Sequence, residues 1–409
     1  MIAVLRLSLA VIVFLASLLA VFPEPTYNLW KLAIAVTEWG WVLALIALIP
    51  LLPGWSSTTT GRIAAVLSVI AIVLSLSPLV RAVPIARDLA ARLDHAFGCG
   101  VPGLDSTGGN APSSRPVASI ACIMSMRSET GATMRPAPLV FTDVIRGVRS
   151  PSVSVSTHTY VVRDGKPLEL DMYRSTPPAA NAPLVVMIHG GSWRGGGRGA
   201  LSPLNRYLAA RGYAVAAVSY RLAPEHLHPA ASEDVAAAIA YLKSNAARHR
   251  VDSSRIVLIG RSAGGQLALL GAYTVNDPAI RGVVSFYGPS DQKYGYDHPS
   301  KPRVLDSRGI LEGFLGGTPA TVPAAYASSS PINYVGSHTI PTLLIHGTRD
   351  ELVFPAQSEM LAARLAAAGR PHFYLELPWG RHGCDFNFSG PCGQLSTFAI
   401  ERFLTAVMK

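Results

Sequence analysis

Ser262 lies in the segment Gly260-Arg261-Ser262-Ala263-Gly264, a Gly-x-Ser-x-Gly pattern that is typical of a nucleophilic serine. A β-branched apolar run at 256–259 precedes this segment, and residues 266–270 have helical character. A sharp turn between a strand and a helix pushes the serine hydroxyl clear of the backbone, and the two glycines leave room for that turn. A helix N-cap is the competing interpretation of the serine. The strand-turn-helix context favours nucleophilic catalysis.

A serine on such a turn needs a base to take its proton and an acid to orient that base. In chains that use this turn, the acid and then the histidine follow the serine in sequence. Asp350 follows an apolar run at 343–346, and His382 follows a run that ends at residue 377. Catalytic groups gather where the strands of a parallel sheet end. We therefore expect His382 to act as the base and Asp350 to fix its tautomer.

Three other residues compete for these two roles. Glu351 is the serious rival to Asp350, because it is the next residue in the same segment. Asp385 is too close to His382 in sequence to serve as the acid in this order. His346 lies inside an apolar run, so we expect a packed structural residue there.

The segment His189-Gly190-Gly191-Ser192-Trp193 follows directly on an apolar run at 184–188. Glycines let backbone N–H groups approach an oxygen that develops negative charge, and the residue after the nucleophile supplies a further N–H. We therefore expect Gly190, Gly191 and Ala263 to form an oxyanion hole. A phosphate-binding loop is the alternative, but no Gly-Lys-Ser/Thr sequence opens the following helix.

The elements that must position these residues alternate along the second half of the chain. Residues 153–173 are typical of an antiparallel hairpin, with its turn at Asp164-Gly165. Apolar strands separated by helices are expected at 184–188, 213–219, 256–260, 282–286, 342–346 and 372–377. Such alternation predicts a parallel sheet covered by helices on both faces. The connection over 288–340 is long, and we expect it to form a lid over the site.

Four motifs in this order resemble the hormone-sensitive-lipase-related esterases of the α/β-hydrolase superfamily. They are His189-Gly190-Gly191, Tyr220-Arg221-Leu222-Ala223-Pro224-Glu225, the segment 260–265, and Asp350 with His382. The resemblance covers about residues 155–409. It implies hydrolysis of carboxylic esters through an acyl-enzyme without a cofactor, and a structural role for 220–225. Ser192 stands where the family has a third glycine, which affects the third backbone donor and leaves the first two intact.

The N-terminal part of the chain is strongly apolar. With 15% charged residues and a mean hydropathy of +0.31, the chain is too apolar for an ordinary soluble protein. Runs at 5–22, 32–52 and 63–80 each match a hydrocarbon core of about 30 Å, so we expect three transmembrane helices. A signal peptide is the alternative for the first run, which lacks a clear cleavage site. Glu38, in the second run, is expected at the membrane interface.

The charges that flank these runs bear on orientation. Arg6 and Arg62 would lie on one side of the membrane. The residues on the other side are Lys31, Arg81, Arg87 and Arg92. The positive-inside rule then favours, by a narrow margin, a catalytic region in the cytoplasm.

The four cysteines point in the opposite direction. They form two close pairs, Cys99 with Cys122 and Cys384 with Cys392, which suit disulfides in an oxidising compartment. Reduced thiols are the alternative. We expect reduced thiols, because the charge bias acts on membrane orientation directly, whereas the pairing of cysteines only permits disulfides. The spacing resembles no zinc site, so no metal is expected.

We predict an α/β-hydrolase domain over 141–409, preceded by a three-helix membrane anchor over 1–83 and by an amphipathic helix and linker over 84–140. The amphipathic helix either lies on the membrane or docks on the domain. Every catalytic motif lies beyond residue 180, so removal of 1–97 is expected to leave a soluble, active domain.

The leading functional hypothesis is a multi-pass, membrane-anchored serine esterase or lipase for a small-molecule or lipidic ester. An acyltransferase or a peptidase of the same fold is the second hypothesis, because fold does not decide between acceptors. A non-catalytic membrane binding protein is the third. The net charge of +10 reflects the membrane flanks, and no basic patch interleaved with aromatic residues indicates nucleic acid.

Overall fold

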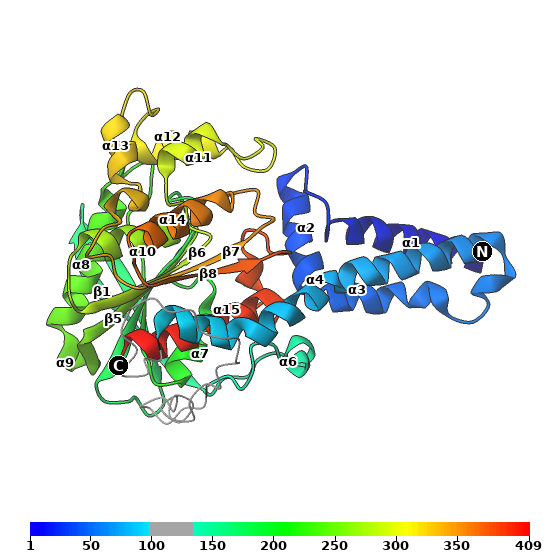
Figure 1. The fold of residues 1–409 in the computed structure, drawn as a ribbon, viewed down its shortest axis with the longest axis horizontal. Helices are drawn as coiled ribbons and strands as arrows, with labels where there is room; N and C mark the ends of the chain where they lie inside the picture. Colours follow the sequence, from blue (N-terminus) through cyan, green and yellow to red (C-terminus); the bar gives the residue numbers. More distant parts are fainter. Residues whose placement is uncertain (99–133) are drawn as a thin grey trace, which may run out of the picture.

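A mostly parallel sheet forms the centre of the catalytic domain. The computed structural model of the chain describes residues 1–98 and 134–409, and within them the sheet has eight strands in the order β1-β2-β4-β3-β5-β6-β7-β8 (Figure 1). The pair β1–β2 is antiparallel, as the predicted hairpin requires, and β2 also pairs antiparallel with β4. The strands are β1 (Val153–Arg163), β2 (Lys166–Ser175), β3 (Ala182–Ile188), β4 (Ala214–Val218), β5 (Val251–Arg261), β6 (Ile280–Phe286), β7 (Thr342–Gly347) and β8 (His372–Leu377).

The central strands are apolar throughout because both faces of the sheet are covered. Successive side chains of β3 enter two different layers: Leu184 and Val186 pack on one face, and Val185 and Met187 on the other. Helices α8, α10 and α14 cover the first face, and α7, α15 and the end of α4 cover the second. The helices of the domain are α6 (Phe141–Arg146), α7 (Ser202–Ala210), α8 (Ala230–Ser244), α9 (Ala246–His249), α10 (Ala263–Thr274), α14 (Ala356–Ala367) and α15 (Pro391–Val407).

The connection between β6 and β7 forms the lid that the sequence predicted. It contains α11 (Gln292–Asp297), α12 (Ser307–Leu315), α13 (Pro323–Ser328) and the 3₁₀ turn η3 (Pro331–Tyr334). Residues of α11 and α12 line the same cavity as Ser262. The indole of Trp193, in the loop after β3, stacks on Phe314 of α12 with ring centroids 4.3 Å apart. The lid is therefore packed directly on the loop that carries the predicted oxyanion hole.

A helical bundle projects from the domain at the N-terminal end (Figure 1). Its elements are α1 (Ile2–Leu18), α2 (Tyr27–Glu38), α3 (Gly40–Ala47), η1 (Ile49–Leu51), η2 (Trp55–Ser57) and the first part of α4 (Thr59–Phe97). The prediction of three transmembrane helices is wrong. Among the described residues, α4 alone is long and apolar enough to cross a membrane, because α1 has only 17 residues.

The second apolar run is not one helix but two, bent by 81° between Tyr27–Glu38 and Gly40–Leu51. Counted together, this bent pair would be at most a second span. The bend has a packing cause on each side. The carbonyl of Glu38 accepts a hydrogen bond from Asn387 of the domain, whereas Gly40 packs so closely on α4 that a Cβ there would lie 2.0 Å from the Ser75 carbonyl oxygen.

The second part of α4 docks on the domain. Helix α4 continues through Pro78 and Pro84, and Ala82, Leu89 and Leu93 are buried in the second layer. Arg402 of α15 holds Asp94 at 3.2 Å. Docking, rather than lying on the membrane, is therefore the arrangement of the amphipathic segment. The boundary predicted between residues 83 and 84 falls inside α4, so removal of 1–97 would also remove core residues of the domain. Most of the predicted linker lies outside the described residues, with Cys99 and Cys122.

Candidate active site

The turn at Ser262 has the strained geometry that its motif predicts. Ser262 lies between the end of β5 and the start of α10, with φ 53° and ψ −123°, a conformation that residues with side chains rarely adopt. A Cβ on Gly260 would lie 2.0 Å from the Gly264 carbonyl oxygen, and one on Gly264 would lie 2.2 Å from the Ile188 carbonyl oxygen. Glycine is therefore required at both positions, because the backbone of the turn packs against itself and against the end of β3.

The structure brings the three residues predicted for the triad together. His382 Nε2 lies 2.9 Å from Ser262 Oγ, and His382 Nδ1 lies 2.7 Å from Asp350 Oδ2. Asp350 follows β7 and His382 follows β8, so both lie beyond the carboxyl ends of parallel strands. An ionised carboxylate only accepts hydrogen bonds, so Nδ1 carries the proton and Nε2 is free to accept the proton of the serine hydroxyl.

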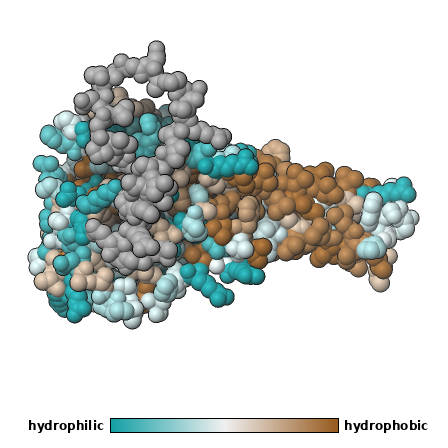
Figure 2. Space-filling view, turned by 60° about the horizontal axis from the view of Figure 1, so that its bottom comes forward, coloured by the Kyte–Doolittle hydropathy of each residue, from teal (hydrophilic) through white to brown (hydrophobic). Residues whose placement is uncertain are grey.

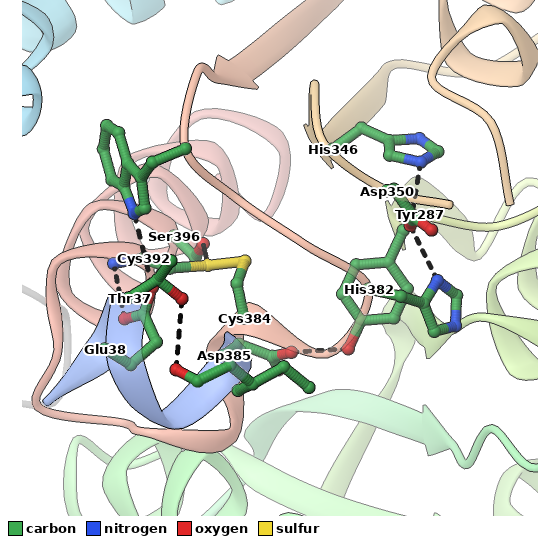
Figure 3. Close-up of a disulfide and its surroundings, with 12 residues drawn as sticks. Thr37, Glu38, Tyr287, His346, Asp350, His382, Cys384, Asp385, Cys392 and Ser396 are labelled. Carbon is green, nitrogen blue, oxygen red and sulfur yellow. Dashed lines mark hydrogen bonds and ion pairs between the residues drawn. A yellow bond between two sulfur atoms is a disulfide. The ribbon is translucent and has the colours of Figure 1, made fainter. Parts of the chain in front are cut away.

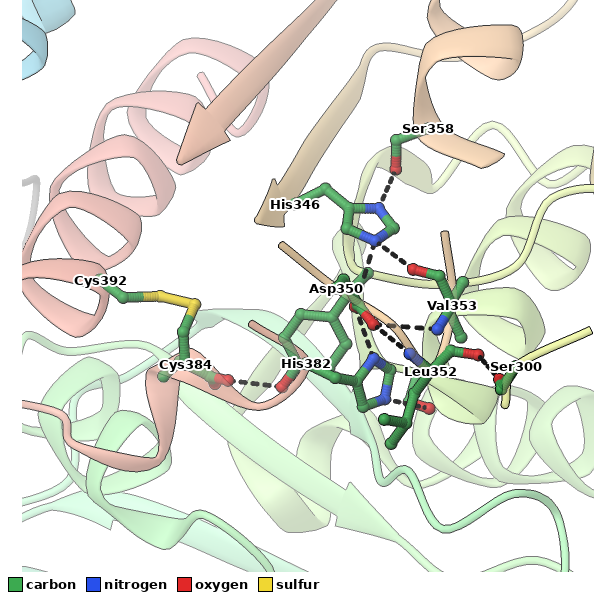
Figure 4. A network of polar contacts seen from close by, with 12 residues as sticks. Ser300, His346, Asp350, Leu352, Val353, Ser358, His382, Cys384 and Cys392 are labelled. Atoms are coloured by element: carbon green, nitrogen blue, oxygen red, sulfur yellow. Dashed lines mark hydrogen bonds and ion pairs between the residues drawn. A yellow bond between two sulfur atoms is a disulfide. The ribbon is translucent and has the colours of Figure 1, made fainter. Parts of the chain in front are cut away.

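Several donors hold Asp350 in its ionised form. The backbone N–H groups of Leu352 and Val353 each donate to Oδ1 at 2.9 Å (Figure 4). Burial by itself raises the pKa of the Asp350 carboxyl, but the charge of His382 and the hydrogen bonds of His346 and His382 outweigh burial. The pKa of Asp350 therefore lies below its ordinary value of 3.8.

His346 is buried, as expected of a packed residue, but it also contacts the acid. Its Nε2 lies 3.2 Å from Asp350 Oδ2 and 2.9 Å from the Val353 carbonyl oxygen, while Nδ1 lies 2.7 Å from Ser358 Oγ. Figure 4 shows this chain of contacts. The sequence signal for this role was weak: a histidine four residues before the acid, at the end of the same strand.

The two rival carboxylates have other partners. Glu351 pairs with Lys301 of the lid segment at 3.1 Å. Asp385 forms an ion pair with Arg261. It also accepts a hydrogen bond from Tyr287 at 2.5 Å, which Figure 3 shows. Burial, followed by the charge of Asp385, raises the pKa of Tyr287 well above its ordinary value, so the phenol stays protonated. Its ring lies 4.4 Å from the ring of His382 and supports one face of the imidazole.

The residues of the predicted oxyanion hole lie around Ser262. Ala263 is the first residue of α10, and a Cβ on Gly190 would lie 3.2 Å from Ser262 Cβ. Gly191 has φ 128°, and a Cβ there would lie 2.2 Å from the Gly195 carbonyl oxygen. Glycine at 190 therefore lets the loop after β3 approach the nucleophile, and glycine at 191 allows the tight turn within that loop.

Tyr220 supports this loop from behind, which agrees with the structural role implied for 220–225. Its hydroxyl donates to the His189 carbonyl oxygen at 2.9 Å, and its ring stacks on the His189 imidazole at 4.2 Å. Burial lowers the pKa of His189, which favours the neutral ring. Arg221 is held in turn by Asp234 at 2.8 Å.

The cavity beside Ser262 is small and largely apolar. It has a volume of about 70 Å³ and lies between the lid and the loop after Asp350. Its apolar lining includes Leu305, Ile310, Leu311, Leu352, Val353 and Phe354. Within residues 1–98 and 134–409, no group of three His, Cys, Asp or Glu side chains is arranged to hold a metal ion.

Cys384 and Cys392 form a disulfide, with Cα atoms 5.8 Å apart (Figure 3). The expectation of reduced thiols is therefore wrong for this pair. The bridge joins the turn η4 (Cys384–Phe386) to the start of α15, and it closes a loop that begins two residues after His382.

Comparison with known proteins supports the assignment of the domain. The family model BD-FAE matches residues 170–365. Esterase LipC of Mycobacterium tuberculosis is 32% identical over 257 residues, which are 58% of this chain and 62% of LipC. The probable carboxylic ester hydrolase LipM of the same organism is 30% identical over 259 residues, which are 59% of each chain.

A solved structure titled bacterial heroin esterase matches with a TM-score of 0.55 at 21% identity, over 63% of this chain and 85% of that chain. The domain has the α/β-hydrolase fold. Its curated relatives include esterases, which agrees with the resemblance noted from the motifs at the level of α/β-hydrolase esterases. This chain spans about three fifths of the length of the two mycobacterial relatives. The residues that match the family model all lie within the α/β-hydrolase domain.

Proposed function

We propose that this chain is a serine hydrolase that cleaves carboxylic esters through an acyl-enzyme. The observation that carries the proposal is the continuous contact from Ser262 Oγ to His382 and from His382 to the buried Asp350. A non-catalytic binding protein has no need of this contact on a strained nucleophile turn. The esterase relatives support the same reaction class.

The geometry supports the following sequence of steps. Ser262 Oγ attacks the ester carbonyl carbon while His382 Nε2 takes the hydroxyl proton. The N–H groups of Gly190, Gly191 and Ala263 bind the oxygen that becomes negative. The tetrahedral intermediate then collapses, the C–O bond to the alcohol breaks, and the imidazolium protonates the leaving alcohol. In the second half, water attacks the acyl carbon while His382 Nε2 takes one of its protons; the C–O bond to Ser262 then breaks, the imidazolium returns the proton to Oγ, and the carboxylic acid leaves. Asp350 stabilises the imidazolium throughout.

The small apolar cavity favours an ester with a short acyl group. A volume of about 70 Å³ beside Ser262 suits a short acyl group better than a long chain. An esterase transfers the acyl group to water, whereas an acyltransferase transfers it to an alcohol. We favour water as the acceptor because the relatives are esterases.

We further propose that the N-terminal bundle inserts into a membrane. Figure 2 shows a band of hydrophobic surface over the bundle, bounded by polar residues at its tip and by the domain at its base. Exposed side chains of α1 and α4 contribute to this band: Leu5, Ile12, Leu15, Val66, Val69 and Val73. Apolar patches of this extent on a soluble surface are rare, and a lipid environment would satisfy them.

The disulfide changes the proposed orientation. A bridge between Cys384 and Cys392 suits an oxidising compartment. Arg92 lies on the docked part of α4, where its guanidinium covers the ring of Phe373 at 5.0 Å, so it is not a membrane flank. The charge bias toward the cytoplasm is weaker without it. We therefore propose that the catalytic domain faces the oxidising side of the membrane.

A serine-directed phosphonate probe tests the catalytic proposal. The full-length protein should be labelled at Ser262 and should hydrolyse a water-soluble ester of a short acid. The Ser262→Ala variant should bind no probe and should lose turnover by about a million-fold, because the triad acts as a unit. Near-normal turnover in that variant would refute the assignment.

High salt should not extract the protein from membranes, because ions do not screen hydrophobic insertion.

A further inference from the structure

The segment between α1 and α2 contacts both loops that carry triad residues. Arg381, directly before His382, donates to the Leu19 carbonyl oxygen at 2.6 Å and to the Phe22 carbonyl oxygen at 2.8 Å. Arg349, directly before Asp350, donates to the Val21 carbonyl oxygen. Residues 19–22 therefore hold two loops at the same time: the one that carries His382 (the base loop) and the one that carries Asp350 (the acid loop).

A buried ion pair reinforces this contact. Arg381 also pairs with Glu24, and their side chains are 1% and 0% exposed. Burial lowers the pKa of the Arg381 guanidinium below its ordinary value, although the charge of Glu24 acts in the opposite direction. A buried pair of this kind is weak evidence for stability, because desolvation offsets much of the attraction, but it fixes the relative position of its two partners.

Glu38 holds the base loop on its other side. The Trp379 indole N–H donates to Glu38 Oε1 at 3.3 Å, and the backbone N–H of Cys392 donates to Oε2 at 3.3 Å. Asn387 donates to the Glu38 carbonyl oxygen at 2.8 Å. Figure 3 shows Glu38 beside the disulfide that closes the same loop. His382 thus lies between Arg381 and the segment 384–392. Both are hydrogen-bonded to residues 19–38, which form the base of the bundle.

The base of the bundle also touches the lid and the far end of the acid loop. Trp30 and Ile34 of α2 pack in one cluster with Val304 of the lid and Leu352. The Tyr27 N–H donates to the Arg303 carbonyl oxygen at 3.1 Å. Helix α2 therefore contacts the lid, the loop after Asp350 and the segment that follows His382.

We propose that Glu24 and Glu38 are positioning residues for His382, so that the base of the membrane bundle is a structural part of the active site rather than a tether. This inference rests on the proposed serine-hydrolase function. Neither carboxylate touches the reacting atoms; each acts through the backbone of the base loop. A displacement of about 1 Å in a catalytic group is enough to lower turnover by about a hundredfold.

Steady-state kinetics of the full-length protein in lipid vesicles test the proposal. Glu24→Gln removes the charge but keeps the shape, and we expect kcat to fall by about ten- to a hundredfold, within the range of a 1 Å misplacement. KM for a small soluble ester should stay within about twofold, because the cavity lining is untouched, which is the split expected when only the reacting groups are misplaced. The rate of phosphonate labelling at Ser262 should fall in parallel with kcat.

Glu401→Gln is the matched control. Glu401 is 2% exposed and pairs with Arg211 at 2.6 Å, so it is a buried ion-pair carboxylate of the same kind. Its partners lie on neither triad loop. It should lose stability to a similar extent while kcat stays near the wild-type value. An equal loss of kcat in this control would refute the proposal, since the effect would then be one of general stability.

A second variant guards against misfolding, because a lone buried Arg381 is destabilising. The double variant Glu24→Gln/Arg381→Met removes both charges and should melt close to the wild-type protein, yet keep the low kcat. Wild-type kcat in the folded double variant, or in Glu24→Gln itself, would overturn the inference. Failure of the proposed function is a separate outcome: the wild-type protein would then show neither turnover nor labelling of Ser262.

Discussion

Two histidines contact the same carboxylate oxygen of Asp350. His382 Nδ1 forms a hydrogen bond with Oδ2, and His346 Nε2 lies 3.2 Å from it. One of these is the proposed base and the other is a fully buried residue of β7. The acid is therefore held by its own strand as well as by the base. This arrangement fixes the position of the carboxylate before any substrate binds, and it contributes to the lowered pKa of Asp350.

The pH dependence of stability should reveal this lowered pKa. A carboxyl whose folded pKa is depressed stabilises the fold at pH values above the unfolded pKa, which is 3.8 here. The contribution is lost as the pH falls from there through the folded value. Denaturant unfolding in detergent should therefore show a wild-type advantage over Asp350→Asn that is constant near neutral pH and shrinks below about pH 4. A constant difference down to pH 2 would contradict the assigned environment.

The choice of acid has its own kinetic test. Asp350→Asn should lower kcat by about ten-thousand-fold, because the amide would hold the imidazole in the wrong tautomer. Glu351→Gln should change kcat little, since Glu351 contacts Lys301 rather than His382. The two variants differ by one position and remove the same charge, so each controls for the other. The reverse ranking would transfer the role to Glu351.

The triad could be predicted from the sequence because each of its members follows an apolar strand in a fixed chain order. The sheet, the lid and the glycines of the turn follow from equally local patterns. The contact of Glu24 with Arg381 could not be predicted, because 357 residues separate them and no motif links them. The break at residue 39 was also hidden, since a hydropathy window averages over α2 and α3 and carries no information on the packing that bends them.

The disulfide predicts sensitivity to reductant. It closes a short loop next to His382, and a loop of this length stabilises by about 2–3 kcal/mol in the chain-entropy account. Reduction should therefore loosen the base loop, lowering kcat in membranes treated with a strong reductant. A Cys384→Ser/Cys392→Ser variant should start at the lower kcat and show no further response. This variant separates the bridge from Cys99 and Cys122, and an unchanged wild-type kcat under reductant would contradict the role of the bridge.

Two truncations should distinguish the structural from the positioning role of the N-terminal region. Removal of 1–97 strips Leu89 and Leu93 from the second core layer, where both are at most 1% exposed. Two buried leucines contribute about 3–6 kcal/mol, which is comparable with the total stability of about 5–15 kcal/mol. This chain should therefore be recovered mainly as aggregate. Removal of 1–75 keeps the docked part of α4 but lacks Glu24 and Glu38, so we expect a folded domain with kcat reduced at least tenfold, in line with a misplaced base. Thermal melting and phosphonate labelling of the two chains measure the two effects separately. Full activity in the chain lacking 1–97 would show that the bundle only tethers the domain and does not position its catalytic residues.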